Sequence, residues 1–398
     1  VVVSAGDLIG ASPLLSALFH DEPTIEAFNL IGLDFNAVGN HEFDEGWREL
    51  LRMQNGGCHA TDGCLDGDGF AGANFQFLAA NVINDATGRP IFDPVGIKVF
   101  NRARIGFIGM TLEGTPSIVT PSGVEGLTFK DEADTANALV PLLKSRGVET
   151  IVVLIHEGGA QASPAPYNGC TGISGPIVDI VNRLDPEIDV VISGHTHNAY
   201  NCNINGKLVT SAASFGRLVT DIDLKIDRIS GEVVSMAANN VIVTRDVAKS
   251  SLLTDLIAKY QAVAAPIANR VIGSITADIT RSANAAGESA LGDVIADAQL
   301  ANTAPASEGG AVIAFMNPGG IRADFSYNQI SGSEQPGQVT YGEMFTVQPF
   351  GNNLVTLNLT GAQIDTLLEQ QFVGCAQPAN AQKILQVSNG FTYTWSQS

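Results

Sequence analysis

The sequence is poor in positive charge and has no long apolar run. Its 398 residues include 21 Lys and Arg against 41 Asp and Glu, which gives a net charge of -20. Such a protein is poorly suited to holding a nucleic-acid polymer on a broad basic surface. A small phosphorylated ligand is not excluded, because bound metal ions can dominate the local field of a site. No apolar run approaches the ~20 residues that a membrane-spanning helix needs. With 45% hydrophobic residues, the composition is that of a globular protein.

Cysteine is also scarce, and the five residues lack the paired spacing of a zinc knuckle. Cys58 and Cys64 lie in a loop rich in Gly and Asp, whereas Cys170 and Cys202 lie in polar, turn-rich segments. We expect two loop disulfides, one of them closing the loop from Cys58 to Cys64, as in an exported protein. Cys375 is then left over. The acidic loop lacks the closing Glu of an EF-hand, so we interpret it as a surface loop and not as a calcium site.

The sequence has neither an initiator Met nor a signal peptide. It begins within an apolar run and stops soon after a strand-like run, so we expect a fragment of a longer precursor. The expected location is extracellular, periplasmic or at the cell surface, and any anchor to the cell surface or cell wall would lie outside this sequence.

At this length two domains are expected. Residues 1–245 alternate strand-like runs with amphipathic stretches, and residues 246–270 repeat apolar side chains at helical spacing, which predicts a connecting helix. From residue 271 to residue 398 the pattern restarts, with a predicted helix over Gly292–Leu300 and a predicted strand over Ala311–Met316. We therefore expect a larger α/β domain followed by a smaller one.

Histidine is rare, and it is concentrated at the ends of predicted strands. Four of the six histidines follow or close apolar, β-branched runs, which are typical of strands buried on both faces. Polar residues at the carboxyl ends of such strands converge on one edge of a sheet. Their mixed oxygen and nitrogen donors suit Zn, Mn or Fe, and a pair of such ions can act on a phosphoryl group. We predict two divalent metal ions with the ligands Asp7, Asn40, His156, His195 and His197.

We expect His41 to have a catalytic role instead. It follows Asn40 directly, and Asp44 lies three residues further on, where it would face His41 on a helical turn. A charged imidazole held in this way would stabilise negative charge on phosphoryl oxygens or on a leaving group. The alternative is that Asp44 only caps the start of a helix, and the two roles are compatible.

A second group of candidates lies in the smaller domain. A predicted strand leads into a Pro-Gly-Gly turn, where the backbone can approach a ligand closely, and an Arg with a fork suited to phosphate or carboxylate follows. A later turn places an aromatic ring near an amide, as nucleobase recognition requires. Taken singly, these side chains could equally be core or surface residues. The candidates are Asn317, Gly319, Gly320, Arg322, Phe350 and Asn352.

The runs Gly6-Asp7, Gly39-Asn40-His41-Glu42, Ile155-His156 and Gly194-His195-Thr196-His197 resemble motifs of the calcineurin-like metallophosphoesterases. The smaller domain is similar to the C-terminal domain of the 5′-nucleotidases, a family that includes UDP-sugar hydrolases. The resemblance covers essentially the whole chain. It implies a four-layer α-β-β-α sandwich followed by a smaller α/β nucleotide-binding domain that rotates in family enzymes.

The same resemblance implies roles for individual residues. Asp7 would bridge the two ions, His197 would bind the second ion, and the other three ligands would bind the first ion. Phe350 would stack on the base, and Arg281 would help to bind the substrate. The family's opening Asp-x-His motif and its second stacking Phe have no counterpart in this sequence. We therefore expect a weakly held second ion and an impaired fragment.

The resemblance implies a metal-dependent hydrolase that releases phosphate from nucleoside 5′-monophosphates. A 2′,3′-cyclic phosphodiesterase or a hydrolase of nucleotide sugars or dinucleotides would use the same metals and pocket. A non-catalytic, exported nucleotide-binding protein is an alternative of another class. The expected partner is a small nucleotide and not a nucleic-acid polymer.

Overall fold

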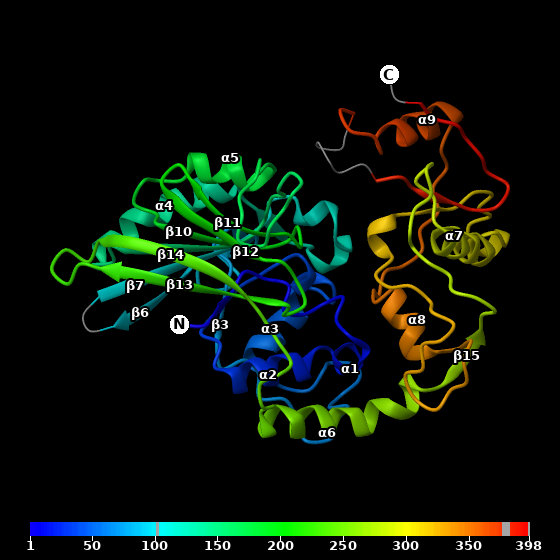
Figure 1. The fold of residues 1–398 in the computed structure, drawn as a ribbon, viewed down its shortest axis with the longest axis horizontal. Helices are drawn as coiled ribbons and strands as arrows, with labels where there is room; N and C mark the ends of the chain where they lie inside the picture. Colours follow the sequence, from blue (N-terminus) through cyan, green and yellow to red (C-terminus); the bar gives the residue numbers. More distant parts are fainter. Residues whose placement is uncertain (101–102, 376–382, 397–398) are drawn as a thin grey trace. The chain divides into compact units, whose positions relative to one another are not determined.

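The apolar, β-branched runs that lead to Asn40, His156 and His195 form largely buried strands, as their sequence predicts. The opening run is instead exposed at Val1 and Val2 and half-buried at Val3 and Ser4. The computed structural model describes residues 1–100, 103–375 and 383–396. The chain divides into a larger unit of Val1–Gly10 and Phe19–Tyr260 and a smaller unit of Ala11–Leu18 and Gln261–Ser398. Figure 1 traces the elements of both units along the chain.

A six-stranded sheet is the largest element of the larger unit, with the strand order β11-β12-β10-β9-β7-β6. The four inner strands run parallel, and both edge strands are antiparallel to their neighbours. Every residue of β9 is buried, as expected for a strand covered on both faces. The strands are β6 (Val95–Phe100), β7 (Ala103–Thr111), β9 (Thr150–His156), β10 (Val190–Ser193), β11 (Ala199–Ile204) and β12 (Lys207–Ala212).

A second layer of strands packs on this sheet. It consists of a parallel sheet of β1 (Val3–Ser4), β2 (Phe35–Ala37) and β3 (Gln76–Leu78), and of the hairpin β13 (Leu218–Ile226) and β14 (Val233–Ile242). One apolar cluster between the layers contains residues from both sheets, among them Phe35, Phe107 and Leu154. The layers approach so closely that a Cβ on Gly96 would lie 2.2 Å from the Phe35 ring.

Helices cover the two outer faces. On one side α4 (Glu132–Ser145) and α5 (Pro176–Arg183) bury their apolar faces against the six-stranded sheet. On the other side α2 (Glu22–Ile31) and α3 (Trp47–Asn55) pack with the smaller sheet (Figure 1). These layers make the α-β-β-α sandwich that the sequence resemblance implied, and this prediction is confirmed. A small sheet of β4 (Val82–Asn84), β5 (Arg89–Pro90) and β8 (Leu127–Phe129) adjoins it.

A long helix, α6 (Ser251–Ala268), occupies the segment in which helical spacing was found. The border between the two units falls within it, after Tyr260. Among the described residues, no helix combines the length and the hydropathy that a bilayer crossing requires.

The smaller unit has short strands around a compact apolar cluster that includes Leu291, Met316 and Val347. The predicted strand over Ala311–Met316 was too long, because β16 (Phe315–Met316) contains only its last two residues, which pair with β18 (Gln386–Val387). The unit contains α1 (Leu14–Ala17), β15 (Val271–Ser274), α7 (Ala290–Thr303), β16 (Phe315–Met316), β17 (Gln338–Thr340), α8 (Tyr341–Val347), α9 (Gly361–Glu369) and β18 (Gln386–Val387).

Two disulfides close loops of the larger unit, as the cysteine distribution predicted. They join Cys58 to Cys64 and Cys170 to Cys202. Cys375 is exposed and forms no disulfide within the described part of the chain.

Candidate functional site

Four strands from two sheets deliver the candidate metal ligands. Asp7 follows β1 and Asn40 follows β2 in the smaller parallel sheet, while His156 closes β9 and His195 follows β10 in the larger one. All four strands end at the same edge of the sandwich, where α/β proteins place their sites. Both sheets are therefore needed to complete the group.

The side chains converge closely. Asp7 Oδ2 lies 2.8 Å from His156 Nε2, and His195 Nδ1 lies 3.1 Å from Asn40 Oδ1. One ligand atom each from Asp7, His156 and His195 lies within 4.8 Å of the others. His197 is not a member of this group, and its ring packs edge-on against Phe215 at 5.5 Å between centroids.

Three of the candidate ligands have a left-handed backbone. The φ angles of Asp7, His195 and His197 are 56°, 65° and 56°. Such angles are uncommon in residues other than Gly and cost on the order of 1–3 kcal/mol each, so they persist where the surrounding structure imposes them. Here the turns at the strand ends aim the side chains toward one another. The neighbouring Gly39 leaves room for this arrangement, because a Cβ on it would lie 2.2 Å from Asp7 Oδ1.

Glu42 organises the first two turns, and our sequence interpretation gave it no role. Its buried carboxylate accepts hydrogen bonds from the backbone N–H groups of Asp7, Leu8 and Gly39 at 2.9, 3.0 and 2.6 Å. Burial and the nearby Asp7 carboxylate raise the pKa of Glu42 to about 7. Glu42 thus fixes the backbone that carries Asp7. The sequence did offer one indication of this role, because Glu42 closes the run Gly39-Asn40-His41-Glu42, which resembles a motif of the calcineurin-like metallophosphoesterases.

Burial and neighbouring charges together shift the pKa values of Asp7, His156 and His195. Burial opposes ionisation of Asp7, but His156 and the His41 backbone N–H outweigh it and lower the pKa of Asp7. Burial likewise opposes the charge on His156, but Asp7 raises the pKa of His156 to about 9. Burial, followed by the charge of His156, lowers the pKa of His195 to about 4, so His195 is a neutral imidazole at pH 7. A neutral imidazole is the form that binds metals.

The residues present fit a divalent metal ion. His156 Nδ1 lies 2.7 Å from the Ala5 carbonyl oxygen, and this hydrogen bond directs Nε2 toward Asp7. His156 Nε2 is buried and has no hydrogen-bond partner within the described part of the chain, although it lies close to the Asp7 carboxylate. A buried polar atom without such a partner is costly unless an ion or water satisfies it. The carboxylate, amide and imidazole donors suit Zn or Mn.

His41 lies beside this group and faces Asp44, as the spacing predicted. His41 Nδ1 is 2.8 Å from Asp44 Oδ2 across the short 3₁₀ helix η1 (His41–Phe43). Asn40 occupies the N-cap position of η1 and Gly46 that of α3, so Asp44 caps the start of neither helix. The capping alternative is therefore wrong, and the carboxylate is free to orient the imidazole.

In the smaller unit the structure brings together part of the predicted nucleoside-binding set. The Arg322 guanidinium carbon lies 5.2 Å from the centre of the Phe350 ring. The Asn317 side chain accepts a hydrogen bond from Gly319 N at 3.1 Å, and a tight turn (Pro318–Gly320) follows. Arg281 Nη1 donates to the Ile321 carbonyl oxygen at 3.2 Å, directly before Arg322. Gly320 is half-buried, and Asn352 is exposed.

Known proteins share both parts of the chain. A model of the calcineurin-like phosphoesterases matches residues 1–199, and a model of the 5′-nucleotidase C-terminal domain matches residues 271–398. Endonuclease YhcR of Bacillus subtilis is 34% identical over 99% of this chain, and cell wall protein Lmo0130 of Listeria monocytogenes is 31% identical over 99%. The chain spans 30% and 51% of the lengths of these two relatives.

A solved structure shows the same architecture. The crystal structure of a 5′-nucleotidase precursor from Thermus thermophilus superposes with a TM-score of 0.74 at 26% identity, and the match covers 97% of this chain and 71% of that one.

Proposed function

Because this chain belongs to the calcineurin-like phosphoesterases, a family of metal-dependent enzymes, and carries a 5′-nucleotidase C-terminal domain, we propose that it hydrolyses nucleoside 5′-monophosphates. The observation that supports this proposal most is the convergence of Asp7, His156 and His195 at one sheet edge, beside the His41–Asp44 pair. Metal-assisted hydrolysis of a phosphoester uses metal ligands with a proton donor close by, and these side chains would supply both.

The residues of the site would have three different roles: metal binding, proton donation and support of the backbone. Asp7, Asn40, His156 and His195 would hold one divalent ion, and Asp7 and His197 would contribute to a second. Such ions, when bound, polarise phosphoryl oxygens and activate water. His41, oriented by Asp44, would donate a hydrogen bond or a proton to the phosphoryl oxygens or the leaving alcohol. Glu42 would keep the Asp7 turn in place through its backbone hydrogen bonds.

The smaller unit would recognise the nucleoside. The Phe350 ring provides a stacking face for a base, and Arg322 supplies planar donors beside it. Arg281, Asn317, Gly319, Gly320 and Asn352 complete the predicted binding set.

A second candidate is the cleavage of phosphodiester bonds in oligonucleotides. The relative named endonuclease YhcR is 34% identical over 99% of this chain, which favours this candidate. The net charge of -20 opposes it, because a long polyanion would be repelled by most of the surface. Small nucleotides and nucleotide sugars contact only the site itself, so the negative charge of the remaining surface opposes their binding far less.

We also propose that the protein acts outside the cytoplasm. Two disulfides close its loops, and one relative is named a cell wall protein. Disulfides persist in oxidising compartments, where nucleotides can be scavenged.

The test is phosphate release from 5′-AMP after removal of metal with EDTA and addition of Mn²⁺ or Zn²⁺. With 2′,3′-cyclic AMP, UDP-glucose and single-stranded DNA the products are separated by chromatography or electrophoresis, because hydrolysis of these diesters does not itself release inorganic phosphate. Asp7→Asn is the inactive control. It uses the protein with any residues that precede Val1 in its gene, because the printed sequence contains no Asp-x-His motif before Asp7.

Metal-dependent release from 5′-AMP that Asp7→Asn abolishes would support the proposal. Cleavage of DNA in preference to 5′-AMP would establish the second candidate instead. Binding of 5′-AMP in a calorimeter without turnover of any substrate would overturn the enzymatic proposal and favour a nucleotide-binding protein.

A further inference from the structure

The two histidines outside the strand-end group lie against each other. His20 precedes α2, and His59 lies in the loop closed by the Cys58–Cys64 disulfide. Their rings stack with centroids 3.8 Å apart and an interplanar angle of 17°. All six histidines of the chain thus belong to one of two groups: four around the predicted catalytic centre, and these two.

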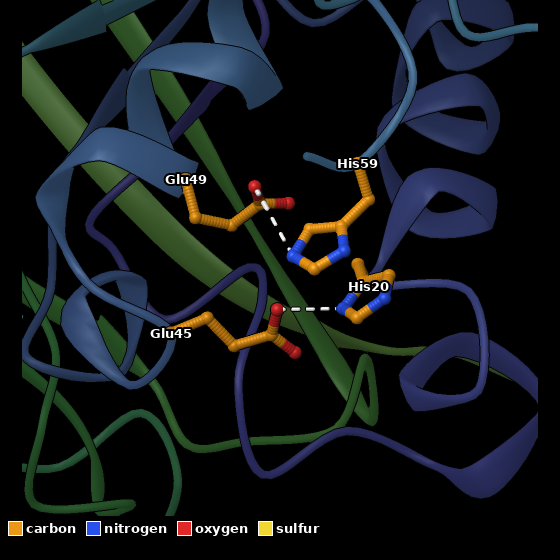
Figure 2. A group of neighbouring side chains, drawn as sticks. All are labelled: His20, Glu45, Glu49 and His59. Atoms are coloured by element: carbon orange, nitrogen blue, oxygen red, sulfur yellow. Dashed lines mark hydrogen bonds and ion pairs between the residues drawn. The ribbon is translucent and has the colours of Figure 1, made fainter. Parts of the chain in front are cut away.

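Two glutamates face the same edges of the stacked rings. Figure 2 shows Glu45 opposite His20 and Glu49 opposite His59, with the four side chains pointing toward a common centre. His20 Nδ1 lies 2.7 Å from Glu45 Oε2, and His59 Nε2 lies 4.0 Å from Glu49 Oε2. One ligand atom from each of the four residues lies within 4.8 Å of all the others.

A third carboxylate binds the opposite edges of both rings. Asp62 Oδ2 lies 3.0 Å from His20 Nε2 and 3.4 Å from His59 Nδ1. Metal-bound imidazoles commonly donate their second N–H to a carboxylate, which fixes the tautomer and makes the ring a better ligand. Asp62 is placed to do this for His20, whereas at His59 the carboxylate would have to replace the hydrogen bond that Nδ1 accepts from the Asp62 backbone N–H at 3.2 Å.

We propose that His20, Glu45, Glu49 and His59 bind a divalent transition-metal ion, such as Zn²⁺, that is distinct from the predicted catalytic ions. Two imidazole nitrogens and two carboxylate oxygens form a donor set that suits Zn²⁺. In a tetrahedral zinc site with bonds of ~2.0–2.1 Å, neighbouring ligand atoms lie about 3.3 Å apart. To enclose an ion, the ligand atoms would have to close in from separations of up to 4.8 Å, and the stacked rings would have to splay so that both nitrogen lone pairs point at it.

Charge and burial favour a cation at this position. Glu45, Glu49 and Asp62 bring three carboxylates to two imidazole rings. A shared metal ion leaves both rings neutral. The side chains of His20, Glu49 and His59 are only 16, 13 and 19% exposed, so they are held in place by their surroundings.

The surrounding contacts also hold the ligands without an ion. Arg52 donates to Glu49 Oε1 at 2.8 and 2.6 Å, which leaves Glu49 Oε2 facing His59. The bridge between His59 and Gly63 forms a narrow loop, and the disulfide closes it. An ion here would join this loop to α3 and to the segment before α2.

The proposed zinc site adjoins the His41–Asp44 pair in the sequence, but its side chains point to different partners. Glu45 follows Asp44 directly, yet Asp44 contacts His41 whereas Glu45 contacts His20. We therefore expect a structural ion that takes no part in catalysis, so its presence is tested by measuring metal binding and not activity.

The experiment is equilibrium dialysis against Zn²⁺ with metal quantified by mass spectrometry, on tag-free protein. The catalytic centre is disabled first by Asp7→Asn with His195→Ala. This background should still bind about one Zn²⁺ per chain, and adding His59→Ala should remove it. Glu187→Gln is the matched control for Glu45→Gln, because the two side chains are similarly exposed, at 43 and 47%.

Asp62→Asn provides a milder variant that preserves the fold. It should weaken Zn²⁺ binding by about 10–100-fold, the usual effect of removing a carboxylate behind a histidine ligand. X-ray absorption at the zinc edge of the background protein should show two imidazoles and oxygen donors. Absence of Zn²⁺ binding in this background, or binding that survives both His59→Ala and Glu45→Gln, would overturn the proposal.

Discussion

The two histidine groups of the larger unit are built on different kinds of backbone. Asp7, His156 and His195 stand at the ends of parallel strands, and two of the three residues are in left-handed turns. His20 and His59 stand on loops, and a disulfide restrains one of these loops. The first group is imposed by the core of the sandwich, and the second by surface contacts.

This difference predicts how each group would respond when one of its residues is replaced. The strands that lead to His156 and His195 have hydrogen-bond ladders on both sides, and the turn at Asp7 is held by Glu42, so replacing one of these residues removes a ligand but leaves the frame intact. A loop residue depends on its neighbours, so the loop itself determines affinity. Variants can test this contrast, beginning with those of largest expected effect.

Asp7→Asn should separate the two groups most clearly. We expect phosphate release to fall about 10⁴-fold, because several kcal/mol of metal-dependent stabilisation are lost and each ~1.4 kcal/mol is tenfold in rate. Zn²⁺ at the His20–His59 group should be unaffected. Initial rates and metal content measure both. Loss of Zn²⁺ from both groups would show that they are not independent.

His41→Ala should lower turnover of 5′-AMP by about 10²–10⁴-fold, the usual range for general acid–base catalysis. Unlike Asp7→Asn, it should leave the metal content unchanged, because His41 is not among the predicted ligands. Asp44→Asn should have a smaller effect, since the imidazole remains and only its orientation is loosened. A fall in bound metal in His41→Ala would contradict the assigned role.

Removal of the Cys58–Cys64 disulfide should affect only the loop-borne group. We expect Cys58→Ser with Cys64→Ser to weaken Zn²⁺ binding there by about 10–100-fold, because Asp62 and His59 lose their common restraint. The matched control is Cys170→Ser with Cys202→Ser, which opens the other disulfide of the same unit. Equal weakening in both double variants would indicate general destabilisation.

Phe350→Ala tests whether recognition of the base is separate from both groups. Loss of one stacking partner costs ~1–3 kcal/mol by analogy with nucleic-acid binding, so KM for 5′-AMP should rise about tenfold. Turnover of p-nitrophenyl phosphate, which has no base, should be nearly unchanged. Equal effects on the two substrates would argue against a stacking role.

The smallest expected effect is a change in stability at Asp189. This residue lies directly before β10, at the opposite end of that strand from His195. Burial raises the pKa of Asp189 to about 6, above its ordinary value of 3.8, so the folded state binds this proton more tightly than the unfolded state. The contribution of Asp189 to the free energy of unfolding is therefore most favourable below about pH 4 and declines as the pH rises through 6.

Asp189→Asn should remove this slope and change the free energy of unfolding by about 1–2 kcal/mol between these limits. Its amide oxygen can still accept the hydrogen bond from Ile151 N, which is 2.9 Å long in the native protein. Urea unfolding at pH 4, 5, 6 and 7 measures the difference. An unchanged slope would mean that Asp189 titrates normally.

Sequence patterns predicted the buried strands and the convergence of Asp7, His156 and His195, whereas the sandwich was implied by the resemblance to a family and His197 lies outside the group. Buried strands leave a clear record in runs such as Thr150–His156, and the carboxyl ends of parallel strands must meet at one edge. The sequence also placed Asp44 opposite His41, because that contact is local in the chain. Glu42 was overlooked, since its partners Asp7 and Leu8 lie 35 and 34 residues away.

Only the tertiary structure brought His20 and His59 together. They are 39 residues apart, belong to no periodic pattern and have no spacing typical of a metal motif. Their contact depends on how the segment before α2 and the disulfide-closed loop pack beside α3. Sequence patterns record what repeats along a strand or a helix, whereas contacts between loops are decided when the packed elements fix the ends of those loops.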